Sequence, residues 1–319
     1  MVTTKLISPK ALHDAWPLSQ RLQGQVESHR LEIKNAIKNN KKVIVIGPCS
    51  IHDPDAAIEY GKRLVELQKR VPDIILVMRV YFEKPRTTVG WKGFINDPNL
   101  DGTFDIVSGL NRGRKLCIDL LELGLPLATE VLDPFTIKYL SGIFSWVAIG
   151  ARTTESQTHR EIASGLPMAV GFKNSTNGSI QVALDAMASS AYPHRYLGID
   201  LDGQISLISA DGNKDTHVIL RGGKDGSEYI TNFDLESALS VPGNVMVDCS
   251  HSNCEGNYLN QVEVAIEAFD HPNVFGLMIE SNIVEGNQKL SDNLVYGKSI
   301  TDACLGWEST EHLILSLRK

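Results

Sequence analysis

Charged or metal-capable side chains recur in this 319-residue sequence directly after short apolar runs. In chain order they are Cys49, Arg79, Glu130, Arg152, Lys173, Arg221, His251 and Glu280, with Lys84 a few residues beyond Arg79. Taken singly, an arginine after a strand is usually a solvated rim residue, and a lone cysteine is usually a small buried hydrophobe. Recurrence at the ends of successive runs is much harder to explain in that way, and it indicates one shared site.

Five of these side chains are cations, and their convergence would call for an anionic ligand. They are Arg79, Lys84, Arg152, Lys173 and Arg221. Gathering them in one cleft without counter-charge would cost several kcal/mol in repulsion and desolvation. Arginine forks bind carboxylates and phosphates bidentately, so we expect a ligand that carries both groups. Structural ion pairs with Glu130 and other acids are the weaker alternative, because one carboxylate cannot neutralise five cations.

A second group of side chains could hold a metal ion. Cys49, His251 and Glu280 supply a thiolate, an imidazole and a carboxylate, and Asp302 supplies a further carboxylate. Such a mixed set suits one borderline divalent ion, namely Mn²⁺, Fe²⁺, Co²⁺ or Zn²⁺. The four residues lie far apart in the sequence, so their spacing alone is a weak signal. A buried thiol and a hydrogen-bonded loop histidine would be the preferred interpretations without the strand-end pattern.

The elements that must position these residues alternate between apolar strands and helices. Strands are expected at 42–46, 74–78, 126–131, 146–150, 168–172, 217–220, 245–247 and 274–279. Near-continuous apolar strands separated by helices are typical of a parallel sheet that is covered by helices. Eight of them predict an α/β fold, a (β/α)₈ TIM barrel, which places its chemistry at the carboxyl ends of the strands. A doubly wound open sheet is the alternative.

Helices and one insertion complete the expected architecture. A helix over 17–39 precedes the first strand, so residues 1–40 are expected to form an N-terminal extension and residues 41–319 the barrel. Asp53-Pro54 and Asp133-Pro134 each predict a helix start, with Asp as the N-cap. A helix over 104–123 ends at Gly124, and a last helix begins at about 299. The alternating segment 196–208 predicts a β-hairpin inserted between strands five and six.

Composition narrows the class of protein. Hydrophobic residues make up 42% and charged residues 22%, which is typical of a globular protein. The formal net charge of -7 argues against a nucleic-acid partner, which requires a basic face. The five cysteines form no C-x-x-C pair, and reduced thiols suit the cytoplasm. No signal peptide is found near the N-terminus, and no apolar run approaches the length needed to span a membrane.

Seven motifs carry a resemblance to a known family. They are Gly47–His52, Arg79–Thr87, Gly150–Ser156, Gly171–Asn174, Leu220–Gly223, Asp248–Ser252 and Gly297–Asp302. Together they resemble the type I 3-deoxy-D-arabino-heptulosonate 7-phosphate (DAHP) synthases, the subfamily regulated by phenylalanine, tyrosine or tryptophan. The resemblance covers the chain from about residue 40 to 310.

The resemblance implies a role for each matching residue. Cys49, His251, Glu280 and Asp302 would bind the divalent metal ion. Arg79, Lys84, Arg152, Lys173 and Arg221 would hold phosphoenolpyruvate, with Glu130 nearby and the backbone of Ala151 at its phosphate. Arg86 and Thr87 would bind the phosphate of erythrose 4-phosphate, because Lys-Pro-Arg-Thr distinguishes this family from its arabinose 5-phosphate-using sister.

The implied reaction is the first step of the shikimate pathway to chorismate and the aromatic amino acids. The enol carbon of phosphoenolpyruvate attacks the aldehyde of erythrose 4-phosphate, water adds at C2, and phosphate leaves. The catalytic residues would be Lys84, which is placed to protonate the new alkoxide, together with Cys49 and His251 at the metal. The metal would polarise the aldehyde or activate a water. The general acid and the general base are not assigned from the sequence.

Regulation and assembly are also implied by the resemblance. Members of the family commonly bind an aromatic amino acid effector between the N-terminal extension and the inserted hairpin, and they form homodimers or homotetramers. Regulated members often carry Ser after Ser-Gly-Leu, where this chain has Pro167, which lacks both a hydroxyl and a backbone N–H. We therefore hypothesise weak or absent feedback inhibition, which strong inhibition by any of the three aromatic amino acids would contradict.

Two other functions fit some of the same residues. Lys173 at a strand end could serve as the nucleophile of a Schiff-base aldolase. Such an enzyme would be trapped by borohydride and would remain active in EDTA. A metabolite-binding barrel without activity is the second alternative, but it would tolerate the loss of metal ligands, and all four are present here.

Overall fold

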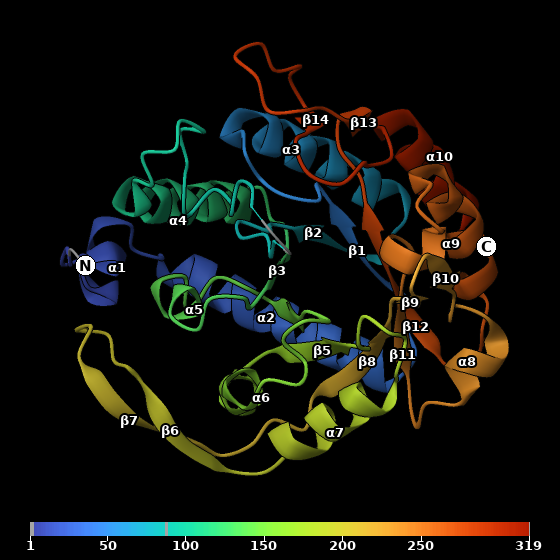
Figure 1. Ribbon diagram of the computed structural model, residues 1–319, viewed down its shortest axis with the longest axis horizontal. Helices are drawn as coiled ribbons and strands as arrows, with labels where there is room; N and C mark the ends of the chain where they lie inside the picture. The colour runs from blue at the N-terminus through green and yellow to red at the C-terminus, as the bar shows by residue number, and fades with distance from the viewer. Residues whose placement is uncertain (1–2, 87–88, 319) are drawn as a thin grey trace.

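Eight parallel strands close into a barrel in this computed structural model, which describes residues 3–86 and 89–318 (Figure 1). The strands are β1 (Val43–Gly47), β2 (Ile75–Arg79), β3 (Leu127–Glu130), β4 (Trp146–Ile149), β5 (Ala169–Lys173), β8 (Thr216–Leu220), β11 (Val245–Asp248) and β12 (Val274–Glu280). Pairing of β1 with both β2 and β12 closes the ring. The predicted (β/α)₈ barrel is confirmed, and the open doubly wound sheet is excluded.

The strands are apolar throughout because both of their faces are buried. In β1, Val43 and Val45 belong to the cluster that fills the inside of the barrel. Ile44 and Ile46 belong to the larger cluster between the strands and the surrounding helices. Side chains of a strand alternate between its faces, so a strand with two buried faces shows a continuous apolar run instead of an alternating one.

Helices surround the strands. They are α3 (Pro54–Arg70), α4 (Ile106–Glu122), α5 (Thr136–Tyr139), α6 (Gln157–Ser164), α7 (Gln181–Ser190), α8 (Leu235–Leu239), α9 (Gln261–Phe269) and α10 (Trp307–Ser316). Asp53 caps α3 by accepting from the N–H groups of Asp55 and Ala56. Asp133 likewise accepts from the N–H groups of Phe135 and Thr136, but α5 is only one turn long.

The N-terminal segment closes the far end of the barrel. Helix α2 (Gln20–Lys38) contributes Ile33 and Ala36 to the cluster of inward-facing strand residues. A shorter helix that was not predicted, α1 (Pro9–Ala15), precedes it. Its Lys10 N–H donates to the Leu201 carbonyl at the tip of the hairpin formed by β6 (His194–Ile199) and β7 (Ile205–Ala210). The hairpin is inserted between β5 and β8 as predicted, and it extends toward α1 (Figure 1).

The prediction of a final helix from about residue 299 was wrong. Two short strands, β13 (Val284–Asn287) and β14 (Lys298–Ser299), pair there, and α10 begins only at Trp307. The cause is local hydrogen bonding, since the Ser299 hydroxyl accepts from the Thr301 N–H and holds a turn instead of a helix. This turn leads into Asp302. Among the described residues, no helix combines the length and the apolar character needed to cross a membrane.

Candidate active site at the carboxyl ends of the strands

A cavity of about 720 Å³ lies at the carboxyl ends of the barrel strands. The predicted site residues that line it are Lys84, Arg86, Glu130, Ala151, Arg152, Lys173, Arg221, His251, Glu280 and Asp302. Cys49 and Arg79 are fully buried and lie outside the lining. Thr87 lies outside the described residues.

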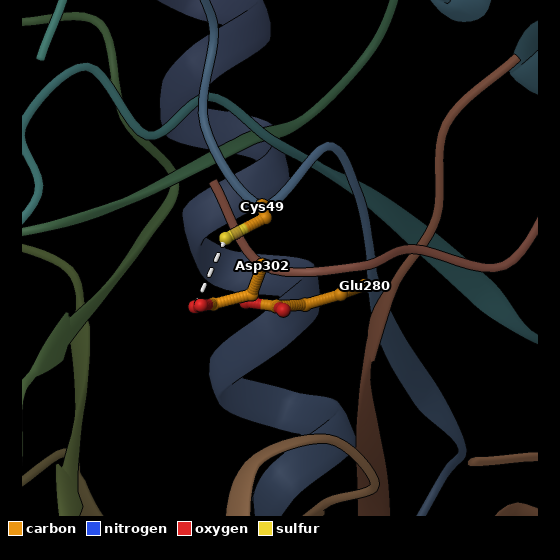
Figure 2. Close-up of side chains that lie close together, drawn as sticks. All are labelled: Cys49, Glu280 and Asp302. Carbon is orange, nitrogen blue, oxygen red and sulfur yellow. Dashed lines mark hydrogen bonds between the residues drawn. The ribbon is translucent and has the colours of Figure 1, made fainter. Parts of the chain in front are cut away.

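Three of the four predicted metal ligands lie together (Figure 2). Ligand atoms of Cys49, Glu280 and Asp302 all fall within 4.8 Å of one another. Cys49 follows β1, Glu280 ends β12, and Asp302 follows β14, so closure of the barrel brings together residues that are distant in the chain. A sulfur and two carboxylates can hold a borderline divalent ion, so the donor set fits a metal.

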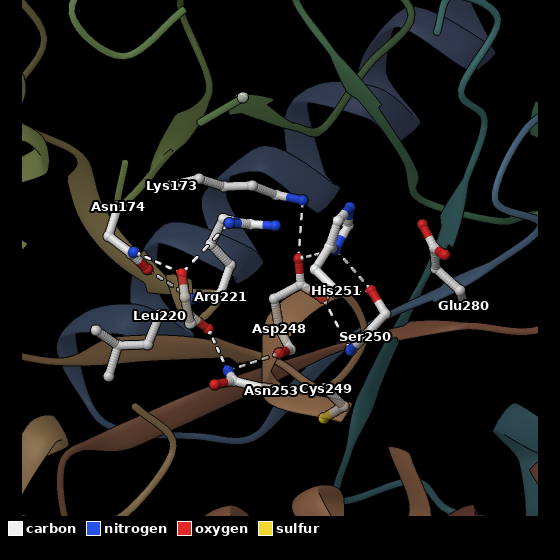
Figure 3. A network of polar contacts seen from close by, with 12 residues as sticks. Lys173, Asn174, Leu220, Arg221, Asp248, Cys249, Ser250, His251, Asn253 and Glu280 are labelled. Carbon is white, nitrogen blue, oxygen red and sulfur yellow. Dashed lines mark hydrogen bonds and ion pairs between the residues drawn. The ribbon is translucent and has the colours of Figure 1, made fainter. Parts of the chain in front are cut away.

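His251 lies at the same cavity but outside that three-residue cluster. Its Nδ1 is 2.8 Å from Asp248 Oδ2 and 2.8 Å from Ser250 Oγ (Figure 3). A carboxylate can only accept a hydrogen bond, so His251 Nδ1–H donates to Asp248. This hydrogen bond fixes the orientation of the imidazole ring. This leaves Nε2 as the nitrogen able to bind a metal or a ligand, the arrangement commonly found for metal-binding histidines.

Lys84 lies against the cluster. Its Nζ donates to Cys49 Sγ at 3.0 Å and lies 3.9 Å from Asp302 Oδ2. Burial raises the pKa of the Cys49 thiol to about 12, and Glu280 adds to this effect. For Lys84, burial opposes the charge, but Cys49, Glu280 and Asp302 raise its pKa above the usual range. The acidic groups around Lys84 therefore hold it as an ammonium.

Arg79 forms a buried ion pair beneath the cavity. Its Nη2 donates to Glu280 Oε1 at 3.0 Å, and its guanidinium lies 3.9 Å from the centre of the Tyr81 ring. Its Nη1 is shielded from solvent and has no hydrogen-bond partner among the described residues. An unsatisfied buried donor is costly, so this nitrogen requires a water or a ligand.

Lys173 is also paired with an acid. Its Nζ donates to Asp248 Oδ2 at 2.8 Å, and both side chains are almost fully buried (Figure 3). Burial opposes ionisation of Asp248, but His251 and Lys173 hold its pKa well below the usual range. The weaker alternative of structural ion pairs therefore holds for two of the five cations, Arg79 and Lys173, with acids other than Glu130. Asp248 and Glu280 each neutralise one cation, which leaves fewer charges for the ligand.

Arg221 is the cation most clearly exposed to repulsion. Burial lowers its pKa, and neighbouring Arg152 lowers it further, while Asp248 acts in the opposite sense. No carboxylate lies within 4.0 Å of Arg221 in the described part of the chain. A cavity wall on which Arg152 disfavours the charge of Arg221 is a site where an anion is favourable.

Buried asparagines hold these strand ends in register. Asn174 Oδ1 accepts from the Arg221 N–H at 2.7 Å, which ties β5 to β8. Asn253 Nδ2 donates to the carbonyls of Leu220 and Asp248, which ties β8 to β11 (Figure 3). None of these supporting residues was proposed from the sequence. Asn174 and Asp248 lay within the quoted motifs, so the signal was present but was assigned to their neighbours.

Two further lining residues come from a hairpin that was not predicted, formed by β9 (Gly223–Asp225) and β10 (Glu228–Ile230). Lys224 Nζ lies 4.4 Å from the centre of the Tyr229 ring, and both residues line the cavity. Lys224 therefore adds a cation to the wall. On the opposite strand ends, a Cβ added at Gly150 would lie 2.2 Å from Glu130 Oε1, so only glycine leaves room for that carboxylate.

A closed eight-stranded barrel with a cation-lined cavity and a thiol–carboxylate cluster at its carboxyl ends defines a barrel enzyme for anionic substrates. The model of the DAHP synthetase I family matches residues 25–314. The chain belongs to this family, which confirms the predicted resemblance and the predicted class of enzyme.

Individual relatives agree over nearly the whole chain. The Tyr-sensitive phospho-2-dehydro-3-deoxyheptonate aldolase of Escherichia coli K12 is 49% identical, over 98% of this chain and 92% of that protein. The Phe-sensitive enzyme of the same organism is 46% identical, over 98% and 93%. A solved phospho-2-dehydro-3-deoxyheptonate aldolase from Francisella tularensis SCHU S4 superposes with a TM-score of 0.94 at 43% identity, covering 99% of this chain and 98% of that one.

Proposed function

We propose that the cavity condenses phosphoenolpyruvate with D-erythrose 4-phosphate and water, giving DAHP and inorganic phosphate. Membership of the DAHP synthetase I family supplies the reaction. The observation that carries the proposal is the division of one cavity into two halves. Lys173, Arg152 and Arg221 form an anion-binding wall, and Lys84 stands beside the Cys49–Glu280–Asp302 cluster.

Phosphoenolpyruvate is assigned to the cationic wall. Arg152 and Arg221 bind its charged oxygens, with the Ala151 backbone at the phosphate and Glu130 beside it. Binding of a dianion relieves the repulsion between the two arginines. The free Nη1 of Arg79 is a further donor that a ligand oxygen reaching the cavity floor would satisfy.

The metal is assigned to Cys49, Glu280 and Asp302, with His251 Nε2 as the fourth ligand. When bound, such an ion supplies Lewis-acid chemistry to a carbonyl or a water. We propose Mn²⁺, Fe²⁺, Co²⁺ or Zn²⁺, since the donors combine sulfur, nitrogen and oxygen. Asp248 holds the imidazole with Nδ1–H directed away from the cavity, so Nε2 stays available.

Lys84 is proposed as the proton donor of the condensation. The C3 carbon of phosphoenolpyruvate bonds to the aldehyde carbon of the sugar, and the carbonyl oxygen becomes an alkoxide that takes a proton from the Lys84 ammonium. The acids around Lys84 keep it charged for that step. Water then adds at C2, and loss of phosphate completes the reaction. Arg86, at the cavity mouth with its Nε bonded to the Trp91 carbonyl, is assigned to the sugar phosphate together with Thr87.

An aromatic amino acid effector, weak inhibition by it and a homodimeric or homotetrameric state are proposed as well. Relatives are named as Tyr-, Phe- and Trp-sensitive, which supports an effector, and Pro167 supports weak inhibition. The hairpin carries exposed apolar side chains at Leu197, Ile205 and Leu207, which supports a further chain packing there. All five cysteines are free thiols, in keeping with the expected cytoplasmic location. Inhibition assays test the effector and the weak inhibition, and light scattering after gel filtration tests the oligomeric state.

Turnover of the two substrates, with and without a chelator, tests the function. We expect phosphate release that EDTA abolishes and a divalent ion restores. Cys49→Ala should lose at least about 100-fold in kcat through loss of a metal ligand. Cys117→Ala, at a cysteine buried in α4 away from the cavity, is the matched control and should stay close to wild type. Full metal-independent turnover by Cys49→Ala would refute the metal role.

The Schiff-base alternative has a separate readout. Borohydride with substrate should label Lys173 only if its amine attacks a carbonyl. We expect no label, because Asp248 binds that Nζ inside the barrel. Labelling at Lys173 together with full activity in EDTA would favour the alternative instead.

A further inference from the structure

The segment that carries Lys84 is an extended stretch with side chains on opposite sides. Glu83 pairs with Gly93 in an isolated antiparallel bridge, and the Lys84 N–H donates to the Lys92 carbonyl at 2.9 Å. Consecutive side chains of an extended segment point to opposite faces. Lys84 accordingly reaches Cys49 at the cavity, while Glu83 reaches Thr136 at the start of α5.

The contact of Glu83 with α5 is well defined. Thr136 Oγ1 donates to Glu83 Oε1 at 3.1 Å. Thr136 is itself fixed, because its N–H donates to Asp133 Oδ1. The carboxyl group lines a small cavity of about 10 Å³, which holds at most about one water. The apolar side chains of Ile137 and Phe144 also line this cavity.

The surroundings of this carboxyl group are acidic. Asp133 from the β3–α5 loop, Glu130 from β3 and Thr136 from α5 all line the same small cavity. No Lys, Arg or His nitrogen lies within 4.0 Å of Glu83 among residues 3–86 and 89–318. Burial, reinforced by Asp133, raises the pKa of Glu83 to about 8. Glu83 is thus a neutral acid at neutral pH.

The opposite side of the segment is clamped by backbone. A Cβ added at Gly93 would lie 2.0 Å from the Phe82 carbonyl oxygen, so the returning chain packs directly on the segment. The Gly93 φ of 121° lies in the region that favours glycine. The segment is therefore held by main chain on one side and by the Glu83–Thr136 contact on the other.

We propose that Glu83 is a positioning residue for the condensation, docking on Thr136 so that the segment directs the Lys84 ammonium at the cavity. This inference rests on the proposed role of Lys84. Glu83 itself touches neither substrate nor the Cys49 cluster. Its effect is geometric, and displacements of about 1 Å in a catalytic group can cost about 100-fold in rate.

Three variants test the inference in the full-length, metal-loaded enzyme. Glu83→Ala should lower kcat by at least about 10-fold with the KM for phosphoenolpyruvate within about twofold of wild type, since the cationic wall is untouched. Glu83→Gln keeps the shape and the acceptor for Thr136 without a charge, and should rescue kcat to within about threefold. Thr136→Val should give an intermediate loss. Glu66→Ala, at an exposed residue of α3, is the surface control.

The pH profile adds a readout that a merely structural role would not change. Above about pH 8, wild-type Glu83 ionises beside Asp133 and Glu130, so the kcat of the wild type should fall. The kcat of Glu83→Gln should show no such fall over the same pH range. The inference is overturned if Glu83→Ala keeps wild-type kcat, or if Glu83→Gln is as impaired as Glu83→Ala. Should Glu83→Ala fail to fold by circular dichroism, Glu83→Gln and Thr136→Val decide. Lys84→Ala separates the two proposals, because full activity there refutes the role of Lys84 itself.

Discussion

A histidine inside the barrel gives a sharp prediction for stability. His217 on β8 is 1% exposed, and its Nε2 accepts from Trp146 Nε1 at 3.3 Å. The Phe275 ring meets it edge-on with centroids 4.8 Å apart. A Cβ added at Gly171 would lie 2.8 Å from Nε2, so there is no space for water on that side. An indole only donates, so the imidazole has to be neutral.

The pH dependence follows from the direction of the shift. Burial lowers the pKa of His217 to about 3, below the value of about 6.5 for an unfolded histidine. A depressed histidine pKa means that the unfolded chain binds the proton more readily. The stability contributed by the neutral ring is complete above about pH 6.5 and is lost as the pH falls toward about 3. At 1.36 kcal/mol per unit, about 2 kcal/mol is lost by pH 5 and about 5 kcal/mol by pH 3.

Urea unfolding at pH 7.5 and pH 5.0 measures this loss. His217→Gln keeps an acceptor for Trp146 but cannot titrate, so it removes the contribution of His217 from the difference between the two pH values. The wild-type free energy of unfolding should fall by about 2 kcal/mol more than that of the variant. Equal losses in the two proteins, within about 0.5 kcal/mol, would show that His217 does not bind a proton on unfolding and would refute the reasoning.

Three further predictions concern the cavity. Asp248→Asn leaves the buried Lys173 ammonium without its carboxylate, so the free energy of unfolding should drop by about 3–5 kcal/mol in urea melts; a loss below about 1 kcal/mol would contradict the pairing. Lys224→Met removes a wall cation, so the KM for phosphoenolpyruvate should rise about threefold with kcat retained and a weaker salt dependence; an unchanged KM and salt dependence would place Lys224 outside the binding wall. Gly150→Ala should displace the Glu130 carboxylate and raise the KM for phosphoenolpyruvate about 10-fold. Unchanged kinetics would show that the backbone at this strand end shifts to make room for the added methyl group.

The strands could be predicted because burial determines which residue types they contain. A run such as 43–47, buried on both faces, has to be apolar at every position. Elements stabilised by a few polar contacts do not require such a pattern, so the sequence predicts them less well. The turn at Ser299 and Thr301 depends on a side-chain hydrogen bond, which the spacing of apolar residues does not predict. Helix α1 depends on its contact with Leu201 at the tip of the hairpin.

The sequence predicted which residues gather at the site, but it did not predict which of them contact one another. Knowing that Arg79 and Glu280 both end strands places them at the same rim. It does not say that they are paired, since 201 residues separate them and closure of β1 onto β12 decides their distance. His251 shows the same limit, because the hydrogen bond from its Nδ1 to Asp248 determines where Nε2 points.

Asp248 explains how the two halves of the cavity are kept in register. Its Oδ2 lies 2.8 Å from Lys173 Nζ on the cationic wall and 2.8 Å from His251 Nδ1 on the side of the proposed metal. A full carboxylate partner for Lys173 weakens the pull of that lysine on an anionic ligand, so attraction alone does not account for the pair. Fixed geometry does, because carbon–carbon bond formation between two bound substrates depends on the distance between their sites. One buried oxygen that contacts both walls fixes that distance.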